Sequence, residues 1–369
     1  MSLLVDHPRL RWVAPAAAVA VIAAGGVFVS RIASADTGLP PRSAAQLLAD
    51  VQQASRSGLS GTVVQTANLG IPQIPSLSGN GTGAVATGTG VSSLTSIIAG
   101  THTWRVWLAG EQQSRLALLS GANESDIIRN ESDLWVWSSR DKSATHYTLP
   151  ASAAASPTPP VSPTDLPKTP ADAASEALAA IDPSTSVTTD GAASVAGRQA
   201  YELVLQPKSQ TTRVAQVRIA IDSETHIPLR VQVYSTKAAN PAFEVGFTSV
   251  DFSTPDARQF QFTPPSGTKV TNSAITPQSV GGGAKPATLT HRLVGTGWDS
   301  VLVATLPADL ATRLGQLKQL LTSLPSVSGS WGRGRVIDGT LFSAVLTEDG
   351  RVAVGAVSPN ALYAALSAP

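Results

Sequence analysis

Three runs near the middle of the chain alternate apolar and polar residues with a period of two. In AYELVLQ, Tyr201, Leu203 and Leu205 alternate with Glu202 and Gln206, and VRIAID and LRVQVYS repeat the pattern. Successive side chains of a strand point to opposite faces, so this alternation predicts antiparallel strands with one apolar and one solvated face. The runs FEVGFTSVDF and FQFTPP are predicted to complete this group of strands.

A second group of strands is predicted upstream. GTVVQTA, HTWRVWL, SRLALLS, SDIIRN, DLWVWSS and THYTLP are short β-rich runs separated by Gly, Asn, Asp and Ser. In DLWVWSS, Trp135 and Trp137 share one face while Leu134 and Val136 share the other. A strand that is apolar on both faces fits a curled sheet whose outer side is covered by another part of the chain.

Two helices are predicted to accompany these strands. Ser43 and Gln46 form a capping-box pattern at the start of SAAQLLADVQQ, and Thr169 with Pro170 begins PADAASEALAAID. About ten antiparallel strands with two helices predict a large curled sheet covered on one side by helices. A cavity between sheet and helices is compatible with this arrangement.

A smaller α+β unit is predicted at the C-terminus. It contains a strand in GTGWDSVLVATLP, a leucine-rich helix in PADLATRLGQLKQLLTSLP and a hairpin turning at Asp349-Gly350. A last helix begins with Ser358 as N-cap and Pro359 at its first position. The low-complexity stretch from Ser273 to Thr290 predicts the boundary that separates this unit from the rest.

The N-terminus predicts an extracytoplasmic protein. Arg9 and Arg11 precede an uncharged apolar run over residues 12–30, and an Ala-Ser-Ala triplet ends at Ala35. This pattern is typical of a signal peptide cleaved after Ala35, and the run is also long enough for a retained membrane anchor. Both alternatives place the chain after Asp36 outside the cytoplasmic membrane, either secreted or anchored to its outer face.

Composition and motifs exclude several classes of function. The formal net charge is +1, which gives no basic field for nucleic acid. The chain has no cysteine, and its five histidines are scattered, so neither a thiolate metal site nor a histidine metal site is expected. No G-x-S-x-G, H-E-x-x-H or phosphate-loop motif occurs. We therefore expect no enzyme activity, no metal and no cofactor.

Five motifs stand in order within residues 43–270: GTHTWRVWLAGEQQSRLALL, ESDIIRNESDLWVWSSRDKSATHYTLP, GRQAYELVLQP, VRIAIDSETHIPLRVQVYS and FQFTPPSGTKV. Together they resemble actinobacterial proteins of the LolA-like superfamily, which joins LolA/LolB lipoprotein carriers with RseB/MucB sigma-E regulatory proteins. The resemblance implies an unclosed antiparallel β-barrel capped by helices, with a hydrophobic cavity for acyl chains. The C-terminal unit looks like the extra domain of the longer, RseB-type members.

The predicted organisation has four parts. Residues 1–35 are a signal peptide or membrane anchor, and residues 36–272 form the LolA-like half-barrel domain. Within that domain, residues 68–100 are a flexible insertion and residues 151–170 a Pro-rich connector. Residues 273–289 form a linker, and residues 290–369 form the small C-terminal domain.

Three functions are kept as hypotheses. One is binding of a lipid, or of the acyl chains of a lipoprotein, in the half-barrel cavity. Another is an RseB-like envelope sensor that contacts a membrane anti-sigma-type partner through the C-terminal domain. The third is a non-catalytic cell-surface structural protein. For the first function, eight side chains are candidates for lining the cavity, and each has core packing as its alternative role: Trp107, Leu116, Trp135, Trp137, Leu203, Ile219, Val231 and Phe247.

Overall fold

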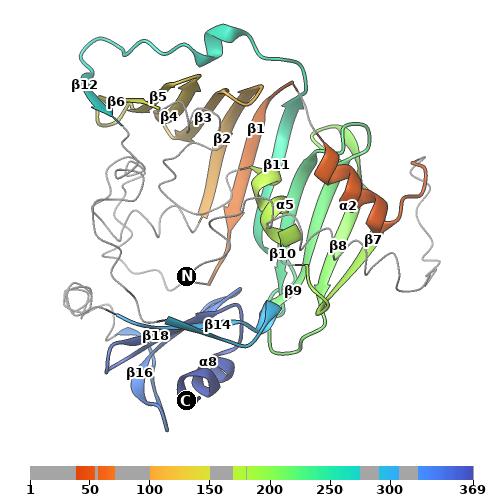
Figure 1. Ribbon diagram of the computed structural model, residues 1–369, viewed down its shortest axis with the longest axis vertical. Helices are drawn as coiled ribbons and strands as arrows, with labels where there is room; N and C mark the ends of the chain where they lie inside the picture. The colour runs from red at the N-terminus through yellow and green to blue at the C-terminus, as the bar shows by residue number, and fades with distance from the viewer. Residues whose placement is uncertain are drawn as a thin grey trace.

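The computed structural model describes residues 39–54, 57–70, 100–149, 169–179, 181–274, 291–306 and 323–368. Two β-sheets form its framework, one of twelve strands and one of six. Figure 1 shows the large sheet curling around two helices, with the small sheet and a third helix below it. The predicted fold, an unclosed β-barrel capped by helices and followed by a small α+β unit, is confirmed.

The large sheet contains two consecutive groups of strands. The first group is β1 (Gly58–Ala67), β2 (Gly100–Ala109), β3 (Gln113–Ser120), β4 (Asn123–Asn130), β5 (Asp133–Ser138) and β6 (Ser143–Thr148). The second is β7 (Thr185–Val195), β8 (Arg198–Pro207), β9 (Val214–Asp222), β10 (Pro228–Ser235) and β11 (Pro241–Asp251), and β12 (Lys269–Ala274) follows. The strand order is β12-β6-β5-β4-β3-β2-β1-β11-β10-β9-β8-β7.

The pairing of β1 with β11 joins the two groups into one sheet. Neighbouring strands are antiparallel, except that β12 runs parallel to β6. β12 and β7 are the two ends of the strand order, so within the described residues the barrel stays open. The predicted antiparallel sheet is therefore found with one parallel pair at its edge.

Helix α2 (Ala44–Gln53) begins with the predicted capping box. The Ser43 hydroxyl accepts a hydrogen bond from the Gln46 N–H, and the Ser43 N–H donates to the Gln46 side chain over 2.9 Å. These reciprocal bonds satisfy backbone donors that the first helical turn leaves free. Leu47 and Leu48 then lie on the buried side of the helix.

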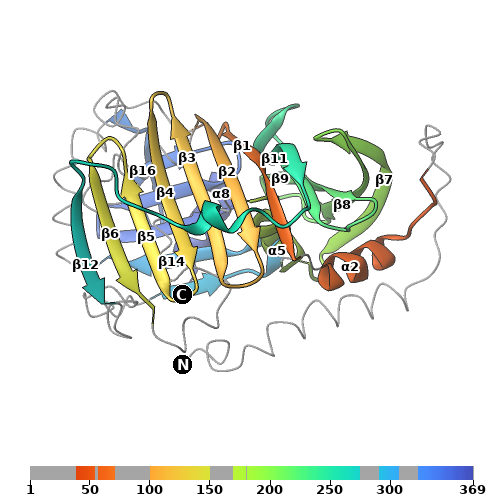
Figure 2. The same cartoon turned by 90° about the horizontal axis from the view of Figure 1, so that it is seen from above.

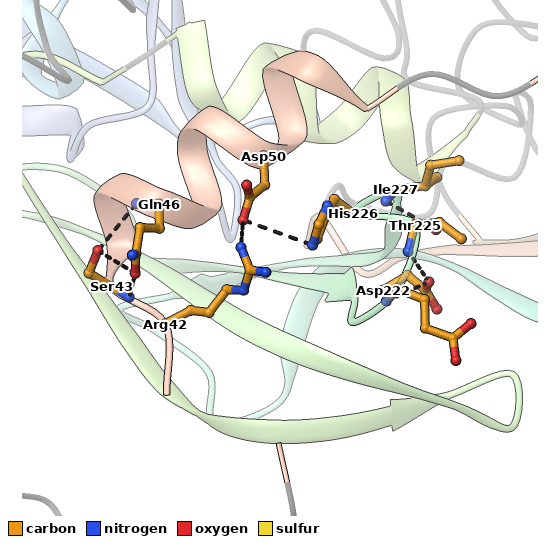
Figure 3. Close-up of polar contacts among 9 residues, drawn as sticks. Arg42, Ser43, Gln46, Asp50, Asp222, Thr225, His226 and Ile227 are labelled. Atoms are coloured by element: carbon orange, nitrogen blue, oxygen red, sulfur yellow. Dashed lines mark hydrogen bonds and ion pairs between the residues drawn. The ribbon is translucent and has the colours of Figure 1, made fainter. Parts of the chain in front are cut away.

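A short chain of charged groups ties α2 to the turn between β9 and β10 (Figure 3). The Arg42 guanidinium binds the Asp50 carboxylate, and His226 Nε2 lies 3.9 Å from Asp50 Oδ2. The turn is held by Asp222, whose carboxylate accepts the Thr225 N–H at 2.7 Å. The helix therefore has a fixed place against the sheet.

Helix α5 (Pro170–Ala179) begins with a similar reciprocal cap, since Thr169 and Asp172 exchange two hydrogen bonds of 3.1 Å. It contacts β10 and β11 and buries Ala173, Ala174 and Leu178 against them. Together α2 and α5 cover one face of the sheet, which we call the inner face. The opposite side is the outer face.

Residues 252–268, between β11 and β12, form a segment that we call the strap. Figure 2 shows it running across the outer face of β2–β6 before β12 pairs with β6. It contains a 3₁₀ helix, η2 (Ala257–Phe260), that contacts β3 and β4. The predicted strand in FQFTPP is wrong, because Phe260 ends η2 and the next described strand is β12. Pro264 and Pro265 lack the N–H that a sheet ladder needs.

The small sheet has the order β13-β14-β18-β17-β16-β15. Its strands are β13 (His291–Val294), β14 (Val301–Thr305), β15 (Ser326–Gly329), β16 (Gly332–Asp338), β17 (Ser343–Thr347) and β18 (Arg351–Gly355). Helix α8 (Pro359–Ser367) covers one face, with Leu362 fully buried. The predicted hairpin is confirmed, and Gly350 takes the left-handed φ of +83° that its turn needs.

Polar contacts join the two sheets. Trp298, in the 3₁₀ helix η3 (Gly297–Asp299), donates from Nε1 to Thr185 Oγ1 at 2.8 Å. Asp338 accepts from both Arg213 and Lys237, at 2.8 and 2.7 Å. The Arg213 N–H also donates to a carbonyl of the loop after β18. The small sheet is therefore fixed to the β7–β10 part of the large one.

Four predictions fall mainly outside the described residues. These are the N-terminal segment 1–35, the insertion 68–100, the Pro-rich connector 151–170 and the linker 273–289. Most of the predicted leucine-rich helix also lies there. Among the helices that the structure does describe, none has the length and apolarity needed to cross a bilayer.

Candidate functional site

Strand register sorts the eight candidate residues onto the two faces of the large sheet. Directly paired residues of neighbouring strands share a face. Trp107 pairs with Ser60 and Arg115, whereas its neighbour Val106 pairs with Leu116. The inner face holds Leu116, Leu203, Ile219, Val231 and Phe247, and the outer face holds Trp107, Trp135 and Trp137. The candidates therefore do not form one site.

Four of the inner-face candidates belong to the main core beneath α5. Leu203 and Ile219 are 0% exposed, and Val231 and Phe247 are nearly as buried. They are packed with Ala173, Ala174 and Leu178 of α5 and with one another. These four side chains pack against α5. Their contact with a ligand stays a prediction.

The inner face of β3–β6 has a different character, because several apolar side chains there are only half buried. Leu116, Ile127, Val136 and Tyr147 are partly exposed, whereas their neighbour Leu134 is 0% exposed. The register places them on the same face as the core but farther from α5. This apolar part of the inner face is the region of the described residues that best suits a hydrophobic ligand.

Trp135 and Trp137 lie on the outer face beneath the strap. The Phe262 ring packs against both, with ring centroids 5.2 and 5.9 Å away. Trp135 also stacks on His146 at 4.4 Å, and His146 Nε2 lies 2.7 Å from Asp133 Oδ1. Strand β5 can be apolar on both faces because the strap covers its outer face and the curled sheet encloses its inner face.

A buried charged cluster that the sequence analysis did not identify lies beside these rings. Asp126, with a side chain 0% exposed, receives a 2.5 Å bond from Arg115 Nη2, and Arg115 also reaches Glu124 at 3.3 Å. Burial raises the pKa of Asp126 to about 7, because the effect of Arg115 only partly offsets it and Glu124 adds to it. Asp126 Oδ1 and the neighbouring Trp137 Nε1 have no hydrogen-bond partner among the described residues.

Trp107, the third outer-face candidate, lies beyond the strap-covered rings, at a polar pocket between β11, β1 and β2. The guanidinium groups of Arg105 and Arg115 lie over its ring, 4.7 and 5.2 Å from the centroid. The sequence pattern could not reveal this, because face and register come from pairing over distant parts of the chain.

The described ranges hold no group of three or more His, Asp or Glu side chains placed to bind a metal ion. The buried Asp126 has Arg115 and Glu124 as its charged neighbours. The described residues present an inner face with half-buried apolar side chains, an outer face with covered rings, and a polar pocket.

The sequence of residues 87–266 matches the MucB/RseB N-terminal domain family. No curated protein matches the chain. Among solved structures, the MucA/MucB complex of Pseudomonas aeruginosa is similar to 88% of this chain and 96% of that one, at 17% identity and a TM-score of 0.42.

Two further structures are similar over less of the chain. An uncharacterised conserved protein of Thermus thermophilus covers 62% of this chain at 12% identity, with 98% of its own length matched and a TM-score of 0.32. A LolA superfamily protein of Nitrosomonas europaea covers 60% at 11% identity, with 99% of its own length matched and a TM-score of 0.22.

Proposed function

We propose, from the premise that residues 87–266 belong to the MucB/RseB N-terminal domain family, that this chain is an extracytoplasmic regulatory subunit. Its partner would be a membrane-anchored, anti-sigma-type protein. The family match is the observation that carries the proposal. The family is generally non-catalytic, which agrees with a role in binding. An extracytoplasmic place also agrees with the signal or anchor pattern over residues 1–35.

The small sheet supports contact with the partner through the C-terminal domain. Leu293 and Leu302 are 65% and 40% exposed, and they face each other as a direct pair on β13 and β14. An exposed apolar pair on a sheet that is fixed to the large domain is a suitable anchor for another protein. The polar contacts of Trp298 and Asp338 would transmit the position of such a partner to the half-barrel.

Binding of host anti-sigma proteins tests this proposal. A panel of extracytoplasmic segments from the host's membrane-anchored anti-sigma proteins is titrated into the secreted chain by calorimetry. We expect one segment to bind and the double variant Leu293→Ser/Leu302→Ser to weaken binding at least about tenfold, because an apolar anchor is lost. Both side chains are exposed, so the variant should keep its thermal stability.

The matched control is Val270→Ser, a residue of β12 that is 44% exposed and lies in the other sheet. It should leave binding unchanged. If no segment binds, or if the control variant weakens binding as much as the double variant, the proposal fails.

Handling of a lipid or of lipoprotein acyl chains is the second candidate function. The observation that favours it is the half-buried apolar set Leu116, Ile127, Val136 and Tyr147 on the inner face of β3–β6. Under this alternative, a lipid should co-purify with the protein when no detergent is used. Ile127→Asp should then abolish lipid retention, because a charge on the apolar surface opposes an acyl chain.

A further inference from the structure

A pocket of about 250 Å³ opens on the outer face of the large sheet, where β11, β1 and β2 run side by side. Register arranges its polar walls in two rows. Ser249, Thr62 and Arg105 form one row, and Asp251, Ser60 and Trp107 form the next. The pocket lies on the opposite side of the sheet from the apolar inner face, so it is separate from any acyl-chain site there.

A β-bulge shapes this pocket. The pairing of β1 with β11 shifts between Thr62 and Val63, and the Thr248 hydroxyl donates to the Thr62 carbonyl at 3.3 Å. Gly61 permits β1 and β11 to approach closely here, since a Cβ on this residue would lie 2.4 Å from the Ser249 carbonyl oxygen. Bulges strengthen twist and redirect side chains, and they occur often beside functional sites.

One wall of the pocket is a stacked pair of planar groups. The Arg105 guanidinium lies 4.7 Å from the Trp107 ring centroid, and among the described residues it forms no ion pair. Stacking uses the face of a guanidinium and leaves its N–H edges available for hydrogen bonds in the plane. Arg115, on the other hand, is already held by Asp126 and Glu124. Arg105 is therefore the cation that the pocket offers to a ligand.

The opposite wall supplies acceptors. Asp251 is exposed and accepts the Ser253 N–H at 2.8 Å on one oxygen, which leaves its other oxygen available. The hydroxyls of Ser60, Thr62 and Ser249 have no hydrogen-bond partner within the described part of the chain. A hydroxyl can both donate and accept. The pocket therefore combines donors, acceptors, a ring and charges of both signs.

We propose that this pocket binds a single neutral sugar ring. The Asp251 carboxylate would repel an anion, and the Arg105 guanidinium would repel a cation. The hydroxyls of a neutral polyol can donate to the carboxylate and accept from the guanidinium. The volume lies below the ~300–1,000 Å³ range of drug-sized sites, which restricts the ligand to about one ring. The polar walls exclude an acyl chain, and Trp107 offers an apolar surface to the C–H groups of a sugar.

A panel of methyl glycosides, added to the secreted chain, tests this site by saturation-transfer NMR and calorimetry. We expect saturable binding of at least one glycoside, unchanged by added NaCl because the ligand carries no charge. Arg105→Gln and Thr62→Val should each weaken it at least about fivefold, since each removes one ligand hydrogen bond. Both changes nearly conserve side-chain size on the surface, so the fold should be kept.

Arg333→Gln is the matched control, because Arg333 is an exposed arginine of the small sheet. It should leave glycoside binding unchanged. Two results would each overturn the proposal: no glycoside binds, or binding survives both pocket substitutions.

Discussion

At the scale of single residues, Asp126 is the most unusual group in the described structure. It is a buried carboxylate whose pKa is raised to about 7 by burial, with Arg115 lowering it and Glu124 raising it. Between its ordinary pKa and about 7, the native state holds a proton that the unfolded state has released. Stability contributed by this group is therefore present at low pH and is lost as the pH rises through about 7.

Asp126→Asn should reduce the dependence of stability on pH. We expect the wild-type free energy of unfolding to fall by a few kcal/mol between about pH 5 and about pH 8, and the variant to fall by clearly less. Urea denaturation at both pH values measures this. Glu111→Gln, at an exposed turn, is the control and should behave as the wild type. Equal pH dependence in Asp126→Asn and the wild type would contradict the account.

The two tryptophans of β5 allow a second prediction at this scale. Because Trp135 and Trp137 pack under Phe262 on the outer face, Trp135→Ala with Trp137→Ala should cost on the order of 2 kcal/mol for each ring. Any lipid retained by the protein should be unchanged, since the inner face is untouched. Denaturant titration and lipid mass spectrometry check the two parts. If the variants lose the lipid but keep the wild-type stability, the two rings contact the ligand and the prediction is wrong.

Residue-level prediction from sequence therefore succeeded in part. The alternation in DLWVWSS correctly separates Trp135 and Trp137 from Leu134 and Val136. It could not say which face is inner, because that depends on where the strap and α5 pack. Asp126 and Arg115 carry no local signal, since their burial is created by β4, β3 and the strap together.

At the scale of elements, the strap connects β11, in the middle of the large sheet, with β12 at one of its edges. It leaves β11, crosses the outer face, and delivers β12 to the free edge of β6 (Figure 2). Phe260 fixes it, because this side chain is 1% exposed in η2. The parallel pair of β12 with β6 then covers an edge that would otherwise be open to other strands.

Phe260→Ala should destabilise the protein by about 3–5 kcal/mol, the usual cost of removing a buried ring. It should also release β12, so amide hydrogen exchange in β12 and β6 should accelerate more than in β8–β10. Hydrogen-exchange mass spectrometry compares these strands. Gln261→Ala, at the adjacent exposed position, serves as the control. Uniform acceleration in all strands would show that the strap has no separate role at this edge.

Elements with strong local signals were predicted, and elements without them were missed. The sequences of β8, β9 and β10 alternate apolar and polar residues, which predicted the strands correctly. The predicted solvated face is wrong for β8, because Glu202 and Val204 on its outer face are also buried. The helices begin after Ser43, Thr169 and Ser358, where the sequence places their starts. β7 was missed because it is an edge strand with several exposed residues in succession. β12 was missed because its partner β6 lies more than a hundred residues earlier, and its parallel pairing has no hairpin turn to indicate it.

At the scale of the whole molecule, hydrogen bonds and ion pairs join the two sheets at several places. Trp298 packs against the main core and binds Thr185, while Asp338 binds Arg213 and Lys237. Inter-domain surfaces of this polar kind resemble transient protein interfaces. Ser209, Thr211 and Ser235 add further hydrogen bonds between the sheets, so Trp298 and Asp338 supply part of the coupling.

Trp298→Ala combined with Asp338→Ala should separate the unfolding of the two sheets. We expect calorimetry to show one thermal transition for the wild type and two for the variant, because each sheet keeps its own core. Leu293→Ala, an exposed change on the small sheet, is the control. A single transition at the wild-type temperature in the double variant would mean that other contacts hold the sheets together.

Binding of a membrane-anchored partner is the central functional claim at this scale, and native mass spectrometry tests it most directly. The secreted chain is purified without detergent, and its mass is measured alone and in mixture with the extracytoplasmic segments of the host's anti-sigma proteins. We predict a complex of one chain with one segment that persists after delipidation and is lost in Leu293→Ser/Leu302→Ser. A discrete lipid mass on the chain, with no complex for any segment, would contradict the regulatory account and favour a lipid carrier.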